Sequence, residues 1–94
     1  MRLWVIAYDI ANDRRRRALV KLLAQCMERV QESVFEGWLN PMEIREVIRQ
    51  TKEIIESAED KVRAYPLALR NEKRCKTLGG QKPARHPQDY WIVG

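Results

Sequence analysis

The sequence contains few of the residues that catalytic sites most often use, with one histidine and two cysteines in 94 residues. His86 stands alone, so a metal site built from several histidines cannot form within one chain. Cys26 and Cys75 belong to no CxxC motif, which indicates neither a zinc site nor a disulfide. We expect Cys26 to be a small core residue rather than a nucleophile. The sequence also has no GxSxG, HExxH or P-loop motif.

Long hydrophobic runs are missing as well, since none reaches the roughly 18 residues that a membrane helix needs. The N-terminal segment carries Asp9 where a signal peptide would have small residues for cleavage. We therefore expect a cytoplasmic protein that does not act at a membrane. Its length predicts one domain, which buries only about 60–70% of its unfolded surface. Association with a second copy would add stability.

The charge is unbalanced, with 18 Lys and Arg against 13 Asp and Glu, a net charge of +5 and a pI near 9.6. Such an excess favours polyanionic partners, either nucleic acid or an anionic surface. Basic residues are concentrated in residues 14–17 and 70–85.

The first half of the sequence predicts a strand and a helix. LWVIAY, residues 3–8, is a continuous apolar run typical of a central strand buried on both faces. Asn12 or Asp13 can cap the helix that follows, which we expect from Asp13 to Arg29. Its apolar stripe has helical spacing and consists of Leu19, Leu22, Leu23, Cys26 and Met27.

Residues 30–40 alternate as a strand, with Gly37 permitting a bulge, a bend or a hairpin, so one bent strand and two short strands both fit. Asn40-Pro41 then predicts the start of a second helix, which ends near Ser57. The next strand begins at Asp60, and Pro66 indicates fraying or an edge there.

The C-terminal part, residues 70–94, predicts a basic loop with a short strand at 76–78 and a last strand, DYWIV. This last strand pairs either within the chain or with the sheet of a second copy. We assign residues 1–69 to the core and 70–94 to the same single domain. The order of elements predicts an α+β, ferredoxin-like sandwich, an antiparallel sheet with two helices on one face.

Four arginines occupy the first turn of the first predicted helix, after the strand that ends in Asp9. Helical spacing places Arg15 and Arg16 above the apolar stripe. Arg14 and Arg17 fall nearer the solvent. Each cation at a helix N-terminus costs roughly 0.3–1 kcal/mol, and a bound anion would reverse the sign. The run predicts either contact with phosphates or a solvated basic face balanced by nearby acids.

Asp9 can be a cap, an ion-pair partner or a metal ligand. Mg²⁺ takes about six oxygen ligands, and one carboxylate is too few to supply them, although this ion keeps several waters. A two-fold dimer would bring two copies of Asp9 together. Such a metal could activate a water for attack on a phosphodiester.

Three stretches resemble one family: YDI at residues 8–10 with the arginine-rich helix start, RVQESVFEG at 29–37, and D-x-V-R-x-Y-x-L at 60–67. They are similar to the small CRISPR-associated endoribonuclease, the second core protein of spacer acquisition (adaptation). The resemblance covers residues 1–69 and, more loosely, the tail.

The resemblance implies a symmetric homodimer with an exchanged C-terminal strand. It also implies a Mg²⁺ or Mn²⁺ site at Asp9 and its symmetry mate, with Tyr8 shaping this catalytic site. Metal-dependent cleavage of RNA or duplex DNA would follow. The predicted nucleic-acid-binding residues are Arg14, Arg15, Arg16, Arg17, Arg29, Ser33 and Phe35.

The same resemblance implies a scaffold role, in which the homodimer holds duplex DNA for the adaptation integrase. Our leading interpretation is this adaptation protein, which also carries the phosphodiesterase site. One alternative is a stand-alone, toxin-like metal-dependent ribonuclease of the virulence-associated group. Another is a ferredoxin-like module that senses a small anionic ligand.

Overall fold

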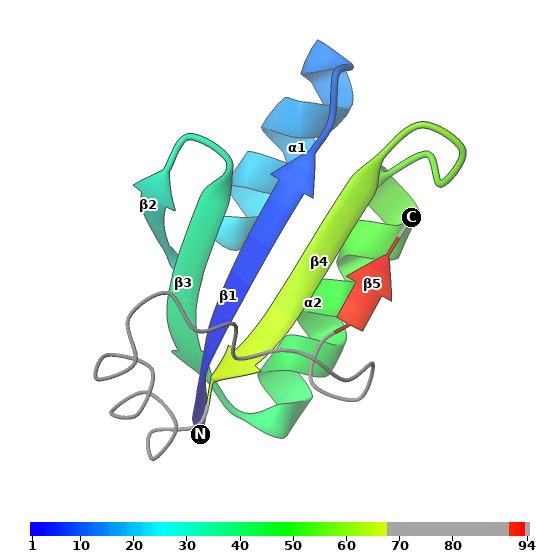
Figure 1. The fold of residues 1–94 in the computed structure, drawn as a ribbon. Coiled ribbons are helices and arrows are strands. Elements are labelled where there is room, and N and C mark those ends of the chain that lie inside the picture. Colours follow the sequence, from blue (N-terminus) through cyan, green and yellow to red (C-terminus); the bar gives the residue numbers. More distant parts are fainter. Residues whose placement is uncertain (68–90, 94) are drawn as a thin grey trace, which may run out of the picture.

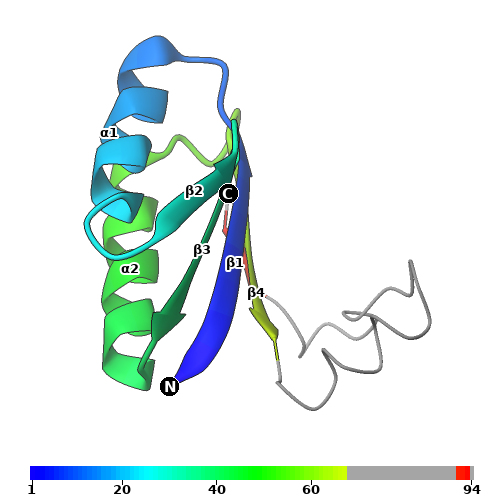
Figure 2. The ribbon, with the colours of Figure 1, turned by 90° about the vertical axis from the view of Figure 1, so that its left-hand side faces the viewer.

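The computed structural model describes residues 1–67 and 91–93. These residues form one sheet with the strand order β2-β3-β1-β4-β5, in which all neighbours are antiparallel. Both helices cover the same face of the sheet (Figure 2), so the predicted α+β sandwich is confirmed. The elements are β1 (Arg2–Asp9), α1 (Asp13–Leu23), β2 (Glu28–Gln31), β3 (Val34–Leu39), α2 (Pro41–Ile54), β4 (Lys61–Leu67) and β5 (Trp91–Val93).

β1 is the central strand, and its side chains alternate between the two faces. Trp4, Ile6 and Tyr8 point to the helices and are buried. The intervening residues, at positions 3, 5 and 7, are only half-buried. The strand is therefore buried on the helix face, as predicted, but not on the second face, because no described element covers that face.

α1 begins as predicted and ends earlier. The Asn12 side chain accepts a hydrogen bond from the backbone N–H of Arg15, which satisfies one free donor of the first turn. The helix ends at Leu23 rather than Arg29, because the chain turns and enters β2 at residue 28. Met27 reaches the core from this turn, while Cys26 is exposed. The prediction of a core Cys26 is thus wrong.

Residues 28–39 form two strands, which settles the open alternative. The register shifts between Arg29 and Gln31, so the irregularity lies in β2 and not at Gly37. Gly37 lies inside β3, where an added Cβ would be 3.0 Å from the carbonyl oxygen of Cys26 and 3.1 Å from Cα of Met27. The missing side chain therefore lets the α1–β2 turn pack directly on β3.

α2 has the predicted capping box: the side chain of Asn40 accepts from the N–H of Glu43, and Glu43 accepts from the N–H of Asn40. This helix ends at Ile54, three residues before the predicted end. Its buried stripe contains Ile44, Val47 and Thr51. None of the helices in the described ranges is long and apolar enough to span a membrane.

β5 pairs with β4 of the same chain, with Val62 opposite Val93. The exchange of this strand with a second copy stays a prediction, as does the division at residue 69. The short strand expected at 76–78 lies outside the described residues.

Candidate nucleic-acid and metal site

One end of the molecule collects the predicted site residues. The carboxyl end of β1, the start of α1, the β2–β3 turn and the loop before β4 all lie there (Figure 1). The four arginines of α1 have different environments at this end, and these environments divide them into two pairs.

Arg15 forms ion pairs within the chain. Its Nε donates to the Asp60 carboxylate at 2.7 Å, and its Nη2 donates to Glu59 at 2.7 Å. Asp60 is 1% exposed and also accepts from the backbone N–H of Glu56 at 2.8 Å. The hydrogen bonds from Arg15 outweigh desolvation and hold the pKa of Asp60 below its ordinary value. Arg15 therefore ties the start of α1 to the loop before β4.

Arg16 folds back over the β1–α1 loop. Its Nη1 donates to the carbonyl oxygens of Ile10 at 3.0 Å and Ala11 at 3.2 Å. Its Nη2 pairs with the carboxylate of Asp13. The predicted contact of Arg16 with phosphate would have to compete with these intramolecular partners.

Arg14 and Arg17 are exposed, and neither forms an ion pair or a hydrogen bond with the residues that the structure describes. They lie three residues apart, one turn along the outer side of α1, as the helical spacing predicts. This pair is the part of the arginine run whose donors stay available to a phosphate.

Asp9 ends β1 with an exposed side chain and lies opposite Lys61 in the sheet register. Its carboxylate has no hydrogen-bond or ion-pair partner within residues 1–67 and 91–93. Alternation along β1 puts it on the open face of the sheet, away from both helices. The ligand position predicted for Asp9 is therefore accessible.

Tyr8 lies on the opposite face from Asp9, so the structure does not bring these two predicted catalytic side chains together. Tyr8 is buried, and its hydroxyl donates to the carbonyl oxygen of Glu32 at 2.9 Å. Arg29 donates to the same oxygen, from Nε at 3.1 Å and from Nη2 at 2.7 Å. These two residues fix the β2–β3 turn, and the role predicted for Tyr8 in shaping the catalytic site stays a prediction.

Phe35 is 1% exposed, so its side chain offers almost no surface for the predicted contact with nucleic acid. Its ring instead supports the guanidinium carbon of Arg29, 5.7 Å from the ring centroid, and lies 6.3 Å from the ring of Tyr8. Ser33 is half-buried, and its carbonyl oxygen accepts from the backbone N–H of Tyr8 at 3.1 Å. Phe35 and Ser33 thus act through the position of the turn.

The donor set at Asp9 suits a hard divalent cation, because a carboxylate with waters is the usual environment of Mg²⁺ or Mn²⁺. Groups of three or more His, Cys, Asp or Glu side chains that could hold a metal do not occur in the described part of the chain. The residues present fit a cation that takes one carboxylate from each of two copies.

Asp60 is the functional neighbour that sequence reasoning did not single out. The stretch at residues 60–67 contained it, but a strand-start aspartate has no local sign of a partner 45 residues earlier. Only the contact between the α1 start and the loop before β4 identifies it.

The fold and this end of the molecule define the class: a small α+β sandwich with free arginines beside a strand-end carboxylate. The family model "CRISPR associated protein Cas2" matches residues 1–75. The CRISPR-associated endoribonuclease Cas2 3 of Synechocystis sp. is 46% identical over 93 residues, covering 99% of this chain and 100% of the relative. The chain belongs to the Cas2 family.

Two solved structures support this assignment. Cas2 of Streptococcus pyogenes superposes with a TM-score of 0.69 at 30% identity, covering 82% of this chain and 99% of the other. A chain of a partial Cas6-RT-Cas1–Cas2 complex gives a TM-score of 0.67 at 28% identity and covers 93% of this chain and 95% of the other.

Proposed function

We propose that this protein acts in CRISPR adaptation as a homodimeric scaffold that holds duplex DNA for the Cas1 integrase. The family and the structural neighbour in a Cas1–Cas2 complex support the adaptation role. Within the chain, the proposal is carried by the division of the arginine run, in which two of four guanidinium groups are free. A surface of this kind contacts phosphates without reading bases.

The duplex-binding surface is centred on Arg14 and Arg17. Lys21 lies one further turn along α1 and is also exposed. Each neutralised phosphate contributes about 0.9 to the log–log slope of affinity against salt. The symmetry of a homodimer doubles this set, and the duplex then spans both copies.

The homodimer forms through the open face of the sheet. In the register of the sheet, Leu3 lies between Trp38 and Leu67. Trp38 is 46% exposed, a large fraction for its size, and no described element covers this face. An uncovered apolar sheet face marks an interface. Asp9 lies on this face, so packing two sheets face to face brings the two carboxylates toward each other.

This arrangement also provides the phosphodiesterase site. Asp9 and its symmetry mate would hold Mg²⁺ or Mn²⁺, and the bound ion would supply an activated water and charge stabilisation. Tyr8 and Arg29 keep the neighbouring β2–β3 turn in place. The names of the relatives, endoribonuclease and endonuclease, favour such an activity.

Integration of a DNA duplex by purified Cas1 with this protein tests the proposal. Arg14→Glu and Arg17→Glu should each weaken duplex binding, and together they should abolish integration. Reversal at Arg15 or Arg16 is less informative, because it would also break their internal contacts. The control Lys52→Glu makes the same charge change on α2, at an exposed residue without a partner in the described ranges. Normal integration by the double variant would refute the scaffold.

Asp9→Ala separates the scaffold from the stand-alone ribonuclease. We expect this variant to lose metal-dependent cleavage and to keep integration, because the scaffold needs only the phosphate contacts. If integration and cleavage are lost together, the nuclease is part of the function.

A further inference from the structure

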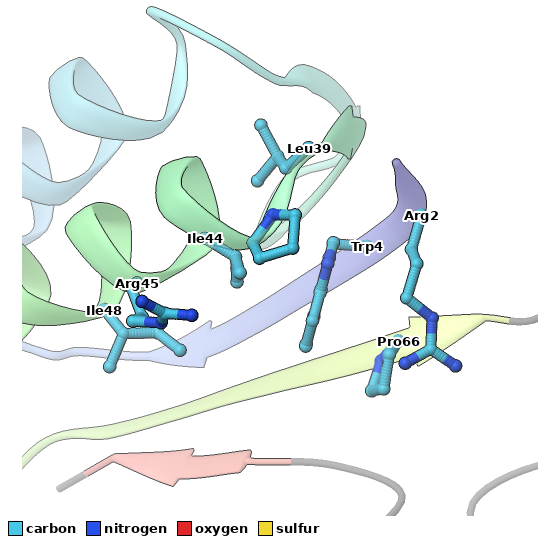
Figure 3. A pocket seen from close by; sticks show the side chains of 8 residues that line it. Arg2, Trp4, Leu39, Ile44, Arg45, Ile48 and Pro66 are labelled. Atoms are coloured by element: carbon cyan, nitrogen blue, oxygen red, sulfur yellow. The ribbon is translucent and has the colours of Figure 1, made fainter.

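A pocket of about 450 Å³ opens on the helix side of the sheet, at the end of β1 opposite Asp9. Trp4, Ile44, Ile48 and Pro66 form its apolar walls (Figure 3). Its size is within the range of pockets that bind ligands or partner side chains. Neither the phosphate surface nor the metal site uses it.

Two arginines from different elements line this pocket, Arg2 of β1 and Arg45 of α2. Both are exposed, and neither has an ion-pair or hydrogen-bond partner among residues 1–67 and 91–93. Their charges are therefore available to an anionic group that enters the pocket.

Trp4 provides a third hydrogen-bond donor. Its side chain is 5% exposed, and its indole N–H has no acceptor in the described part of the molecule. No fully buried side-chain polar atom lacks a partner there, so this N–H keeps some accessible surface, and Trp4 lines the pocket. The indole N–H is therefore an accessible donor that an acceptor entering the pocket can use.

Apolar walls with two exposed guanidinium groups and an accessible indole N–H fit an apolar side chain that lies next to a carboxylate. Nucleic acid is a poorer occupant, because the walls are apolar and a phosphate backbone needs an exposed row of cations. We propose that this pocket docks a segment of the Cas1 integrase that carries such an apolar–acidic pair. The inference rests on the proposed adaptation function and deepens it.

The position of the pocket allows this contact together with the other two. Trp4 precedes Asp9 by five residues, which corresponds to about 17 Å along a strand. The pocket also faces the helices, while the proposed dimer interface is the opposite face of the sheet. A scaffold must bind integrase, duplex and its own second copy at once, and these three surfaces do not overlap.

The test measures the affinity of purified Cas1 for the full chain, by calorimetry, in the wild type and in Arg45→Glu and Arg2→Glu. We expect each reversal to weaken binding about tenfold or more, since it places a carboxylate against the incoming acid. Lys52→Glu is the matched control on α2, outside the pocket, and should bind Cas1 like the wild type. Arg45→Ala, with circular dichroism for folding, should show a smaller loss in the same direction.

The other outcomes overturn the proposal in distinguishable ways. If the wild type binds Cas1 and the pocket variants bind equally well, the pocket assignment fails and the scaffold stands. If the wild type does not bind Cas1, the integrase partnership fails as well. If the pocket variants no longer form the homodimer, the pocket binds a second copy of this chain, and the assignment to Cas1 is wrong.

Discussion

Replacing Asp60 by Asn tests whether the Arg15 ion pair joins α1 to the loop before β4. The carboxylate accepts three hydrogen bonds: from Nε of Arg15 at 2.7 Å, from Nη2 of Arg15 at 3.3 Å and from the N–H of Glu56 at 2.8 Å. Removing one member of a buried ion pair costs about 3–5 kcal/mol. Arg15 keeps 24% of its side chain exposed, which places the expected loss near the lower limit, about 3 kcal/mol.

Thermal unfolding at one fixed protein concentration measures this effect, because the melting temperature of a dimer depends on concentration. A domain of this size loses about 4–8 °C for each kcal/mol, so Asp60→Asn should melt about 12–24 °C lower. Glu59→Gln is the control: Glu59 also pairs with Arg15 but is 69% exposed, so the change should be small. A melting temperature of Asp60→Asn equal to that of the wild type would refute the role of the pair.

The pH dependence follows from the lowered pKa of Asp60. A carboxyl group whose pKa is lowered by folding stabilises the folded state at pH values above its ordinary pKa of about 3.9. This stabilisation is lost as the pH falls through the folded-state pKa. The difference in free energy of unfolding between the wild type and Asp60→Asn should therefore be largest at neutral pH and shrink below about pH 4. A difference that grows on acidification would contradict this sign.

Two further substitutions test the packing around the site. Tyr8→Phe removes the hydroxyl that donates to the Glu32 carbonyl at 2.9 Å and should lower the free energy of unfolding by about 1 kcal/mol in urea; an unchanged value would show that the hydrogen bond does not stabilise the turn. Gly37→Ala places a Cβ 3.0 Å from the Cys26 carbonyl oxygen, against backbone that cannot easily move. We expect a loss on the order of 1–3 kcal/mol, and a melting temperature at or above that of the wild type would disprove the close approach.

The sequence was informative wherever a local pattern determines the structure. The apolar run at residues 3–8 and the Asn40-Pro41 start are local signals, and the structure confirms the strand and the helix start that they predict. The end of α1 was missed because Met27 continues the helical spacing although it reaches the core from a turn. Periodicity predicted the burial of Met27 correctly and that of Cys26 wrongly, and it cannot tell whether a helix or a turn carries a buried side chain.

The arginine run shows the same limit at the site. Helical spacing correctly separated Arg14 and Arg17 from the two arginines nearer the sheet. It could not identify the partners of Arg15, because Glu59 and Asp60 come together with it only through the tertiary fold. The alternation in residues 30–40 also placed Phe35 and Val34 on opposite faces of the strand. It could not show which of the two faces the helices cover. Contacts between distant segments decide which predicted site residues are free.

Cys26 illustrates a case in which the structure changes the chemistry expected of a side chain. The thiol is exposed in the α1–β2 turn, yet partial burial of the sulfur, with a smaller effect from the charge of Glu43, raises its pKa. A raised pKa lowers the thiolate fraction and hence the reactivity. The thiol is therefore less reactive than its exposure alone would make it.

Sedimentation equilibrium of the wild type and Val5→Arg tests most directly whether two copies pack their open sheet faces together. Val5 lies in the centre of this face, between Glu36 and Tyr65. Met42→Arg, at a residue 75% exposed on α2, makes the same kind of change elsewhere. We expect twice the chain mass of 11.2 kDa for the wild type and Met42→Arg, and 11.2 kDa for Val5→Arg. A wild-type protein that sediments as single chains at every concentration would contradict this expectation.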